Sequence, residues 1–210
     1  MDELDDIISE FRNVSRTLHE RGWCEGTNGN LSILINGLYA APEPIGPVFE
    51  TPLFIPQLEK RYIIISRSAS RIQDIPMEPE ENLGLYRIEM GGRWLSLLWG
   101  AGAPSSEWLS HLLIYARNRN RINAVIHSHM EGLYELGKVL MDPAQDLPEW
   151  IGWVPKIKYG TLDLARATVQ EIGERELMVW HDHGILSMSS GLEGALRNLI
   201  RFDEWARSMM

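Results

Sequence analysis

Two histidines one residue apart end a short apolar run, Ala124-Val-Ile-His-Ser-His129. Alternate residues of a β-strand point to the same face, roughly 6.6 to 7 Å apart along the strand, so His127 and His129 could converge on one small ion. A second pair, His181 and His183, repeats this spacing after another apolar run. Both pairs stand at the ends of predicted strands, and this pattern indicates a metal site.

The cysteine content bears on what kind of metal site this is. Catalytic zinc sites typically use three protein ligands and keep a fourth position for water or substrate, whereas closed structural sites rely on cysteine. The chain has a single cysteine, Cys24, so a closed thiolate site is excluded. A lone histidine beside apolar residues, such as His19, is interpreted as a core residue. Three imidazoles suit zinc, but they also suit cobalt, iron or manganese.

A predicted helix opens with two hydroxyls and a carboxylate at Pro104-Ser-Ser-Glu107 and runs to about Asn118. Serine at an N-cap and glutamate in a first turn are ordinary helix-start chemistry. The same helix N-terminus, with its hydroxyls, could equally bind an anion. His111 lies four residues after Glu107 on the same helical face, where it could orient that carboxylate or a metal ligand, or simply be packed.

Two polar turns could also receive an anion. Residues 26–30, Gly-Thr-Asn-Gly-Asn, precede a predicted strand over 31–36, and backbone N–H groups in such a turn can line a concavity, although Asn-Gly is equally an ordinary hairpin signal. Residues 67–71, Arg-Ser-Ala-Ser-Arg, follow a predicted strand over 61–66. Their two arginines and two serines could hold a phosphate or be solvated.

The remaining pattern alternates helices with strands and predicts an α/β domain whose sheet is partly antiparallel. Residues 41–60 carry five of the eleven prolines and are predicted to be an irregular surface excursion. Helices are predicted over residues 3–21, 104–118, 131–141, 161–172 and 192–209. Further strands are predicted in a hairpin of 83–90 and 93–99, around the first histidine pair, over 150–157, through the second histidine pair and over 185–188.

Length, composition and charge limit the class of protein. A chain of 210 residues predicts one domain over 1–210. No apolar run approaches the roughly 20 residues that a membrane helix needs, and the acidic start, Met1-Asp-Glu-Leu-Asp-Asp, is unlike a basic secretory signal. One cysteine is typical of a reducing cytoplasm. A net charge of −9 argues against a nucleic-acid partner.

These motifs, in this order, resemble the class II aldolase/adducin family of metal-dependent sugar-phosphate enzymes. The family pattern is carried by Gly29-Asn30-Leu-Ser, Pro104-Ser-Ser-Glu107, His127-Ser-His129 and His183-Gly184. Within the family the likeness is greatest to the rhamnulose-1-phosphate aldolases, on Gly22-Trp23, Asn28-Gly-Asn-Leu31, Asn82-Leu-Gly84, Leu98-Trp-Gly100 and Trp180. The resemblance implies a three-layer α/β/α fold around a central, mostly antiparallel sheet, and a homotetramer with active sites between subunits.

The resemblance also implies a role for each candidate site residue. His127, His129 and His183 fall on zinc ligands, whereas His181 occupies a position that is not a ligand in the relatives. Glu107 falls on the catalytic carboxylate. The implied phosphate site comprises four residues in contact with the phosphate and two beside it: Asn30, Ser68, Ser105 and Ser106, with Thr27 and Gly29 next to them.

The implied reaction is the reversible retro-aldol cleavage of a ketose 1-phosphate such as L-rhamnulose 1-phosphate. Its products would be dihydroxyacetone phosphate and an aldehyde such as L-lactaldehyde. A divalent cation, zinc or another transition metal, would act as a Lewis acid without a Schiff-base lysine, and Glu107 would move protons. The implied partner is therefore a small sugar phosphate.

Some positions depart from the family pattern and leave alternatives open. Ala69 stands where relatives usually have glycine in the phosphate turn. The segment between Leu140 and Lys158 is shorter than in the relatives, so Glu149 is either a substitute for their second acid or a surface carboxylate. The chain ends soon after Trp205, before the tail that helps to close the site in relatives.

Other functions on the same scaffold remain as alternatives. The site would also suit a fuculose-phosphate aldolase, a pentulose-phosphate 4-epimerase or a methylthioribulose-phosphate dehydratase. A non-catalytic adducin-like interaction domain would lack the metal histidines. A purely structural zinc site would leave Glu107 and the serines at 105 and 106 without a shared role.

Overall fold

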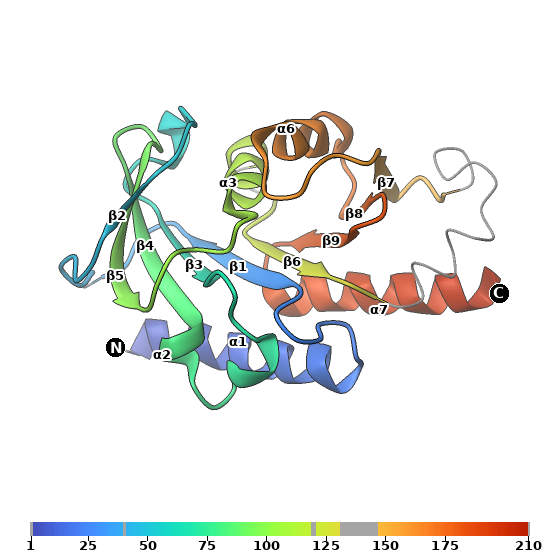
Figure 1. Ribbon diagram of the computed structural model, residues 1–210, viewed down its shortest axis with the longest axis horizontal. Coiled ribbons are helices and arrows are strands. Elements are labelled where there is room, and N and C mark those ends of the chain that lie inside the picture. Colours follow the sequence, from blue (N-terminus) through green and yellow to red (C-terminus); the bar gives the residue numbers. More distant parts are fainter. Residues whose placement is uncertain (1, 40, 119–120, 131–146, 210) are drawn as a thin grey trace.

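A central β-sheet runs through the whole molecule (Figure 1). The computed structural model describes residues 2–39, 41–118, 121–130 and 147–209. Within these ranges the strands are β1 (Asn30–Ile35), β2 (Val48–Glu50), β3 (Tyr62–Ser66), β4 (Leu83–Glu89), β5 (Trp94–Gly100), β6 (Ala124–Ser128), β7 (Ile151–Val154), β8 (Leu177–Trp180) and β9 (Gly184–Ser189).

In the described part of the chain the sheet has nine strands in the order β2-β5-β4-β3-β1-β6-β9-β8-β7. Neighbouring strands are antiparallel, except for β7 and β8, which pair in parallel. The predicted mostly antiparallel sheet is therefore confirmed. The predicted hairpin is β4 and β5, joined through Gly91 and Gly92.

Helices cover both faces of the sheet. They are α1 (Asp2–Glu20), α2 (Pro79–Asn82), α3 (Trp108–Arg117), α6 (Leu162–Glu171) and α7 (Leu192–Met209), with short 3-10 helices at η1 (Pro56–Leu58) and η2 (Ile72–Asp74). The long helices α1 and α7 lie against one face, and α3 and α6 lie against the other (Figure 1). This arrangement confirms the predicted α/β/α layers. No helix of the described ranges is long and apolar enough to cross a membrane.

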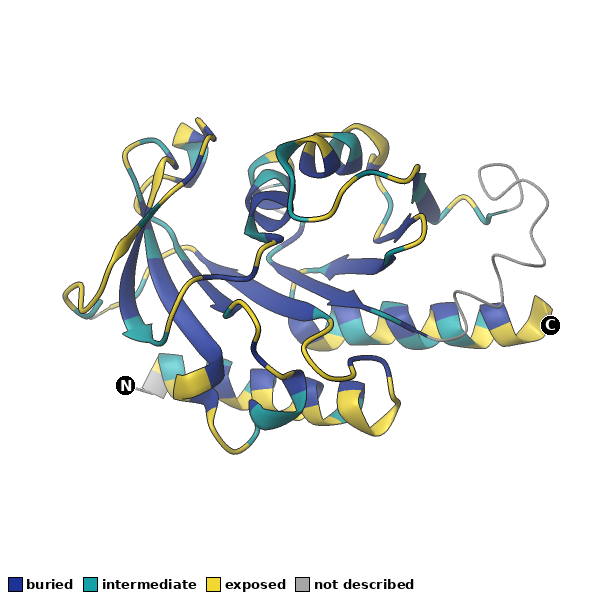
Figure 2. Ribbon diagram, viewed as in Figure 1, coloured by how far each residue is buried: buried dark blue, intermediate teal, exposed yellow. Residues whose placement is uncertain are grey.

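Two hydrophobic cores fill the spaces on either side of the sheet, and most of the strands between them are buried, whereas edge strand β2 is largely exposed (Figure 2). Phe11 of α1 and Phe202 of α7 pack in the first core. Leu112 of α3 and Leu164 of α6 pack in the second. The helices are amphipathic, so the spacing of their apolar residues predicted them from the sequence. The helix predicted over 131–141 lies outside the described residues.

Strand β1 sits at the centre of the sheet and connects both cores. Because successive side chains of a strand point to opposite faces, Leu31 and Ile33 enter the core beneath α1 and α7, and Leu34 enters the core beneath α3 and α6. Asn30 and Ser32 share the face of Leu34. Two polar side chains of β1 therefore point toward α3.

The prediction of an irregular surface excursion over residues 41–60 is wrong in part. Residues 48–50 form edge strand β2, in which Phe49 pairs with Leu95 of β5. The side chains of Leu53, Ile55 and Leu58 are buried. The prolines removed any regular periodicity from this segment, but a short edge strand between Pro47 and Pro52 tolerates them, because its outer side donates no ladder hydrogen bonds.

The sequence suggested that a strand runs through the second histidine pair, and this prediction is wrong. Strand β8 ends at Trp180, and residues 181–183 form a tight turn in which the amide of His183 donates to the carbonyl of Trp180 at 3.0 Å. Asp182 adopts a left-handed conformation with φ of 55°. The turn, not strand alternation, sets the directions of His181 and His183.

Candidate metal centre and active site

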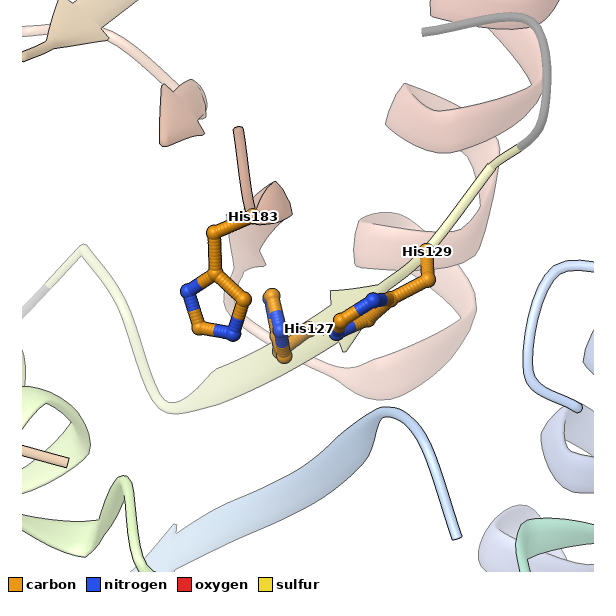
Figure 3. Close-up of side chains that lie close together, drawn as sticks. All are labelled: His127, His129 and His183. Carbon is orange, nitrogen blue, oxygen red and sulfur yellow. Dashed lines mark hydrogen bonds between the residues drawn. The ribbon is translucent and has the colours of Figure 1, made fainter. Parts of the chain in front are cut away.

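Three histidines from two separate segments gather at one point (Figure 3). His127 is the penultimate residue of β6, His129 follows that strand directly, and His183 comes from the β8–β9 turn. One ring nitrogen of each lies within 4.8 Å of the others, and Nε2 of His127 and Nε2 of His129 are 2.9 Å apart. Two nitrogen ligands of a tetrahedral zinc ion lie about 3.3 Å apart, given Zn–N bonds of 2.0–2.1 Å. The donor set and spacing therefore fit a divalent transition metal.

His181 does not belong to this group. Its ring is exposed, lies 3.2 Å from the carboxylate of Asp182 and packs against Trp153. Asp182 also accepts a hydrogen bond from Lys156 at 2.9 Å. The two pairs of equal spacing in the sequence thus have different environments, and only His183 of the second pair faces the site.

The orientation of His127 is fixed by its second nitrogen. Nδ1 donates to the carbonyl of Ile185 at 3.0 Å, which leaves Nε2 free to bind a cation. Burial lowers the pKa of His127 to about 3, and burial followed by the charge of His183 lowers the pKa of His129. Both rings are therefore neutral near pH 7, which is the form that binds metals.

Two glycines allow the backbone to pack against His127. A Cβ at Gly184 would lie 2.7 Å from Cε1 of His127 and 2.5 Å from the carbonyl oxygen of Ser128. Gly29 has φ of +83°, and its Cβ would lie 2.9 Å from the carbonyl oxygen of His127 and 2.6 Å from Sγ of Cys24. Side chains at either position would displace the first histidine of the cluster.

Glu107 lies beside the histidines at the start of α3 and is 4% exposed. Its Oε1 is 3.1 Å from Nε2 of His183, and its Oε2 is 3.5 Å from Nε2 of His127. Oε2 also accepts a hydrogen bond from Nδ2 of Asn30 at 2.8 Å. Burial alone would raise the pKa of Glu107, but these three neighbours outweigh it and lower the pKa to about 2. The carboxylate is therefore ionised at neutral pH.

The predicted site residues line one cavity of about 320 Å³. This volume lies within the range of small-molecule sites. The lining includes Glu107 and the three clustered histidines, together with Thr27, Gly29, Asn30, Ser68, Ser105 and Ser106. Asn28, Arg67, Ala69 and Tyr159 complete it. Glu149 is exposed and is not part of the lining.

The turn after β3 and the start of α3 are joined by backbone hydrogen bonds. The amide of Ser68 donates to the carbonyl of Ala103 at 2.8 Å, and the amide of Ser105 donates to the carbonyl of Ser66 at 3.0 Å. Ala69 has φ of 59°, a conformation that costs a residue with a Cβ roughly 1–2 kcal/mol. Two polar segments far apart in the sequence thus form one wall of the cavity.

Tyr159 is a site residue that sequence reasoning missed. Its side chain is 64% exposed, and its ring lies 5.4 Å from the ring of His183. A tyrosine between a short strand and a helix carries no metal-binding or acid–base signal. The glycine that follows it, at position 160, was the only local sign of a turn there.

The chain matches the family described as Class II Aldolase and Adducin N-terminal domain over residues 9–210, and it belongs to this family. It is 25% identical to a rhamnulose-1-phosphate aldolase of Listeria innocua over an alignment of 215 positions, which covers 90% of this chain and 78% of the relative. It is 26% identical to one of Enterococcus faecalis over 206 residues, with coverage of 85% and 73%. A solved sugar-phosphate aldolase of Thermotoga maritima has the same fold, with a TM-score of 0.85, 21% identity and coverage of 99% and 94%.

Proposed function

We propose that the protein is a metal-dependent aldolase that cleaves a ketose 1-phosphate, such as L-rhamnulose 1-phosphate, to dihydroxyacetone phosphate and an aldehyde. The observation that carries the proposal is the carboxylate of Glu107 beside three clustered histidine rings in a cavity that is also lined by serine hydroxyls. The names of the curated relatives support the aldolase reaction and this type of substrate.

In this proposal His127, His129 and His183 hold the metal. A bound divalent cation, zinc or another transition metal, would supply a Lewis acid for the ketone oxygen of the substrate. The neighbouring Trp180 ring stacks on His183 at 5.3 Å and 17°, and it also lies 4.9 Å from His127. This apolar wall excludes water from one side of the histidine rings and strengthens electrostatic interactions within the site.

Glu107 is the group that moves protons. In the cleavage direction the hydroxyl at C4 loses its proton, the C3–C4 bond breaks and its electron pair stays with C3 and the adjacent carbonyl. C3 then takes up a proton to give dihydroxyacetone phosphate. The carboxylate of Glu107, beside the histidine cluster, can accept the proton of the C4 hydroxyl and deliver it to C3, because it lies beside the carbonyl that the histidine cluster would face.

The serine-rich part of the cavity lining would bind the phosphate. Ser105 and Ser106 precede α3, and Ser68 comes from the turn that packs beside them. Hydroxyls and backbone amides near a helix N-terminus are suited to an anion. Arg67, which also lines the cavity, adds the positive charge that a phosphate would favour.

Replacing Glu107 tests this function. Glu107→Gln keeps the size and the polar contacts of the side chain but removes the base, so we expect a loss of at least roughly 100-fold in kcat with metal content unchanged. Release of dihydroxyacetone phosphate and metal content per chain are the measurements. The matched control is Glu174→Gln, a change at a carboxylate that is 96% exposed and outside the cavity. Near-normal kcat in Glu107→Gln would contradict the role of this residue.

The alternatives that use the same scaffold give different products. A 4-epimerase would invert a hydroxyl without releasing a triose phosphate, and a dehydratase would release water. A non-catalytic adducin-like domain would have no use for the ionised Glu107 beside three histidines. A cytoplasmic location and an assembly of identical subunits, such as a tetramer, stay predictions.

A further inference from the structure

Asn30 is a third neighbour of the Glu107 carboxylate, besides His127 and His183. Its side chain is 5% exposed, lines the cavity and donates from Nδ2 to Oε2 of Glu107 at 2.8 Å. The family resemblance assigns this asparagine to the phosphate instead. In this structure one of its two amide N–H groups is engaged by the carboxylate of Glu107.

The direction of this hydrogen bond sets the orientation of the Asn30 amide. Nδ2 donates to the carboxylate, so the carbonyl oxygen is turned away from it. That oxygen, Oδ1, is buried and has no hydrogen-bond partner among the described residues. The side-chain amide of Asn30 is therefore held through its nitrogen, by the carboxylate that it contacts.

The contact between Asn30 and Glu107 is one of a row of polar contacts between β1 and α3. Two residues along β1, the hydroxyl of Ser32 lies 2.6 Å from Nδ1 of His111, which is one helical turn beyond Glu107. The same hydroxyl lies 2.6 Å from the hydroxyl of Tyr115, one turn further along α3. These three residues are completely buried. The register of the helix against the strand is therefore fixed, and Asn30 is held opposite Glu107.

We propose that Asn30 is a positioning residue for Glu107, the group that moves protons. This inference rests on the proposed aldolase function. The hydrogen bond from Nδ2 holds the carboxylate in place beside His127 and His183. Asn30 therefore acts on the reaction through Glu107, whatever contact its second N–H makes with the substrate.

The test is Asn30→Ala in the metal-loaded protein. We expect kcat for L-rhamnulose 1-phosphate cleavage to fall about 10- to 100-fold, because the carboxylate loses a charge-assisted hydrogen bond. The dissociation constant for inorganic phosphate, measured by calorimetry, should change by less than kcat does. Ser106→Ala should show the opposite pattern, with weaker phosphate binding and a smaller change in kcat.

A double-mutant cycle separates positioning from direct binding. In a Glu107→Ala background, Asn30→Ala should have no further effect on kcat, since it acts through the carboxylate. Asn123→Ala is the matched control, because this asparagine also has a buried, unpartnered Oδ1 but precedes β6 at the end remote from His127. An unchanged kcat with weakened phosphate binding in Asn30→Ala would overturn the inference in favour of the phosphate contact.

A second variant covers the case in which Asn30→Ala does not fold. Asn30→Asp keeps the shape of the side chain but replaces the donor nitrogen by oxygen, so Glu107 would face a like charge and kcat should fall at least as far as in Asn30→Ala. Wild-type kcat in a folded Asn30→Asp protein would overturn the role of Asn30. Absence of triose phosphate release by wild-type protein would overturn the proposed function instead.

Discussion

Replacement of Gly184 by alanine perturbs the metal centre through a residue that is not itself a ligand. The new Cβ would lie 2.7 Å from Cε1 of His127 and 2.5 Å from the backbone oxygen of Ser128, where ordinary contacts lie at 3.4–4 Å. The oxygen of Ser128 belongs to β6 and is held in the sheet. The ring of His127, together with the start of β9, must therefore absorb most of the overlap.

The size of the effect follows from these distances. Relieving the contact with Cε1 requires a shift of about 0.7 Å, whereas metal–ligand distances tolerate only about 0.2 Å. The hydrogen bond from Nδ1 of His127 to Ile185, at 3.0 Å, resists rotation of the ring. Outer-shell changes of this kind typically weaken metal binding 10- to 100-fold, and overpacking a core costs about 1–3 kcal/mol.

Competition titration with a chromophoric chelator would measure this loss. We expect Gly184→Ala to bind zinc 10- to 100-fold more weakly than wild type, with a fall of about 1–3 kcal/mol in the free energy of unfolding of the metal-free protein. Gly37→Ala is the matched control, because a Cβ there would meet nothing within 4 Å. Wild-type zinc affinity in a folded Gly184→Ala protein would refute the placement of His127 in the metal centre.

Further predictions concern the remaining histidines. His183→Ala should weaken zinc binding by at least roughly 100-fold in the same titration, since even the loss of an outer-shell partner weakens binding 10- to 100-fold. His181→Ala should bind zinc as wild type does. Equal losses in the two variants would contradict the assignment of His183, and not His181, to the metal centre. Burial, opposed in part by the charge of Glu107, lowers the pKa of His111 to about 4. The imidazole of His111 therefore takes up a proton near pH 6.5 in the unfolded chain but only near pH 4 in the folded protein. The free energy of unfolding falls as the pH drops between these values, by up to about 3 kcal/mol. Urea unfolding at pH 7 and pH 5 should show a shallower decline in His111→Gln than in wild type, and an identical decline would contradict a buried, neutral His111.

Hydrophobic periodicity predicted most of the fold. The long helices α1 and α7 each carry an apolar stripe that could be recognised without knowing what it packs against. Strands such as β3, with three consecutive buried isoleucines, gave an equally clear signal. Strand β2 could not be predicted, because its three residues have no pattern of their own and depend on pairing with β5.

The candidate site was harder to predict, since its residues meet only after folding. Strand alternation suggested that His127 and His129 share a face, and the structure places their rings together. The same logic failed for His181 and His183, because Asp182 turns the chain between them. Only the family resemblance distinguished these two residues.

The row of polar contacts between β1 and α3 illustrates a second limit of sequence reasoning. The sequence left open whether His111 orients Glu107 or a metal ligand or is simply packed. In the structure its side chain contacts the hydroxyl of Ser32 rather than the side chain of Glu107 or a metal ligand. Asn30 was assigned through the resemblance alone. Its hydrogen bond to Glu107 depends on the register of a strand against a helix 77 residues away, which no local pattern specifies.

The most direct test of the account is a coupled assay of metal-loaded protein with L-rhamnulose 1-phosphate. The account predicts release of dihydroxyacetone phosphate that stops when a chelator removes the metal and returns when a divalent cation is restored. Protein that holds about one cation per chain, as a single three-histidine centre requires, and still releases no triose phosphate would contradict the proposed aldolase function.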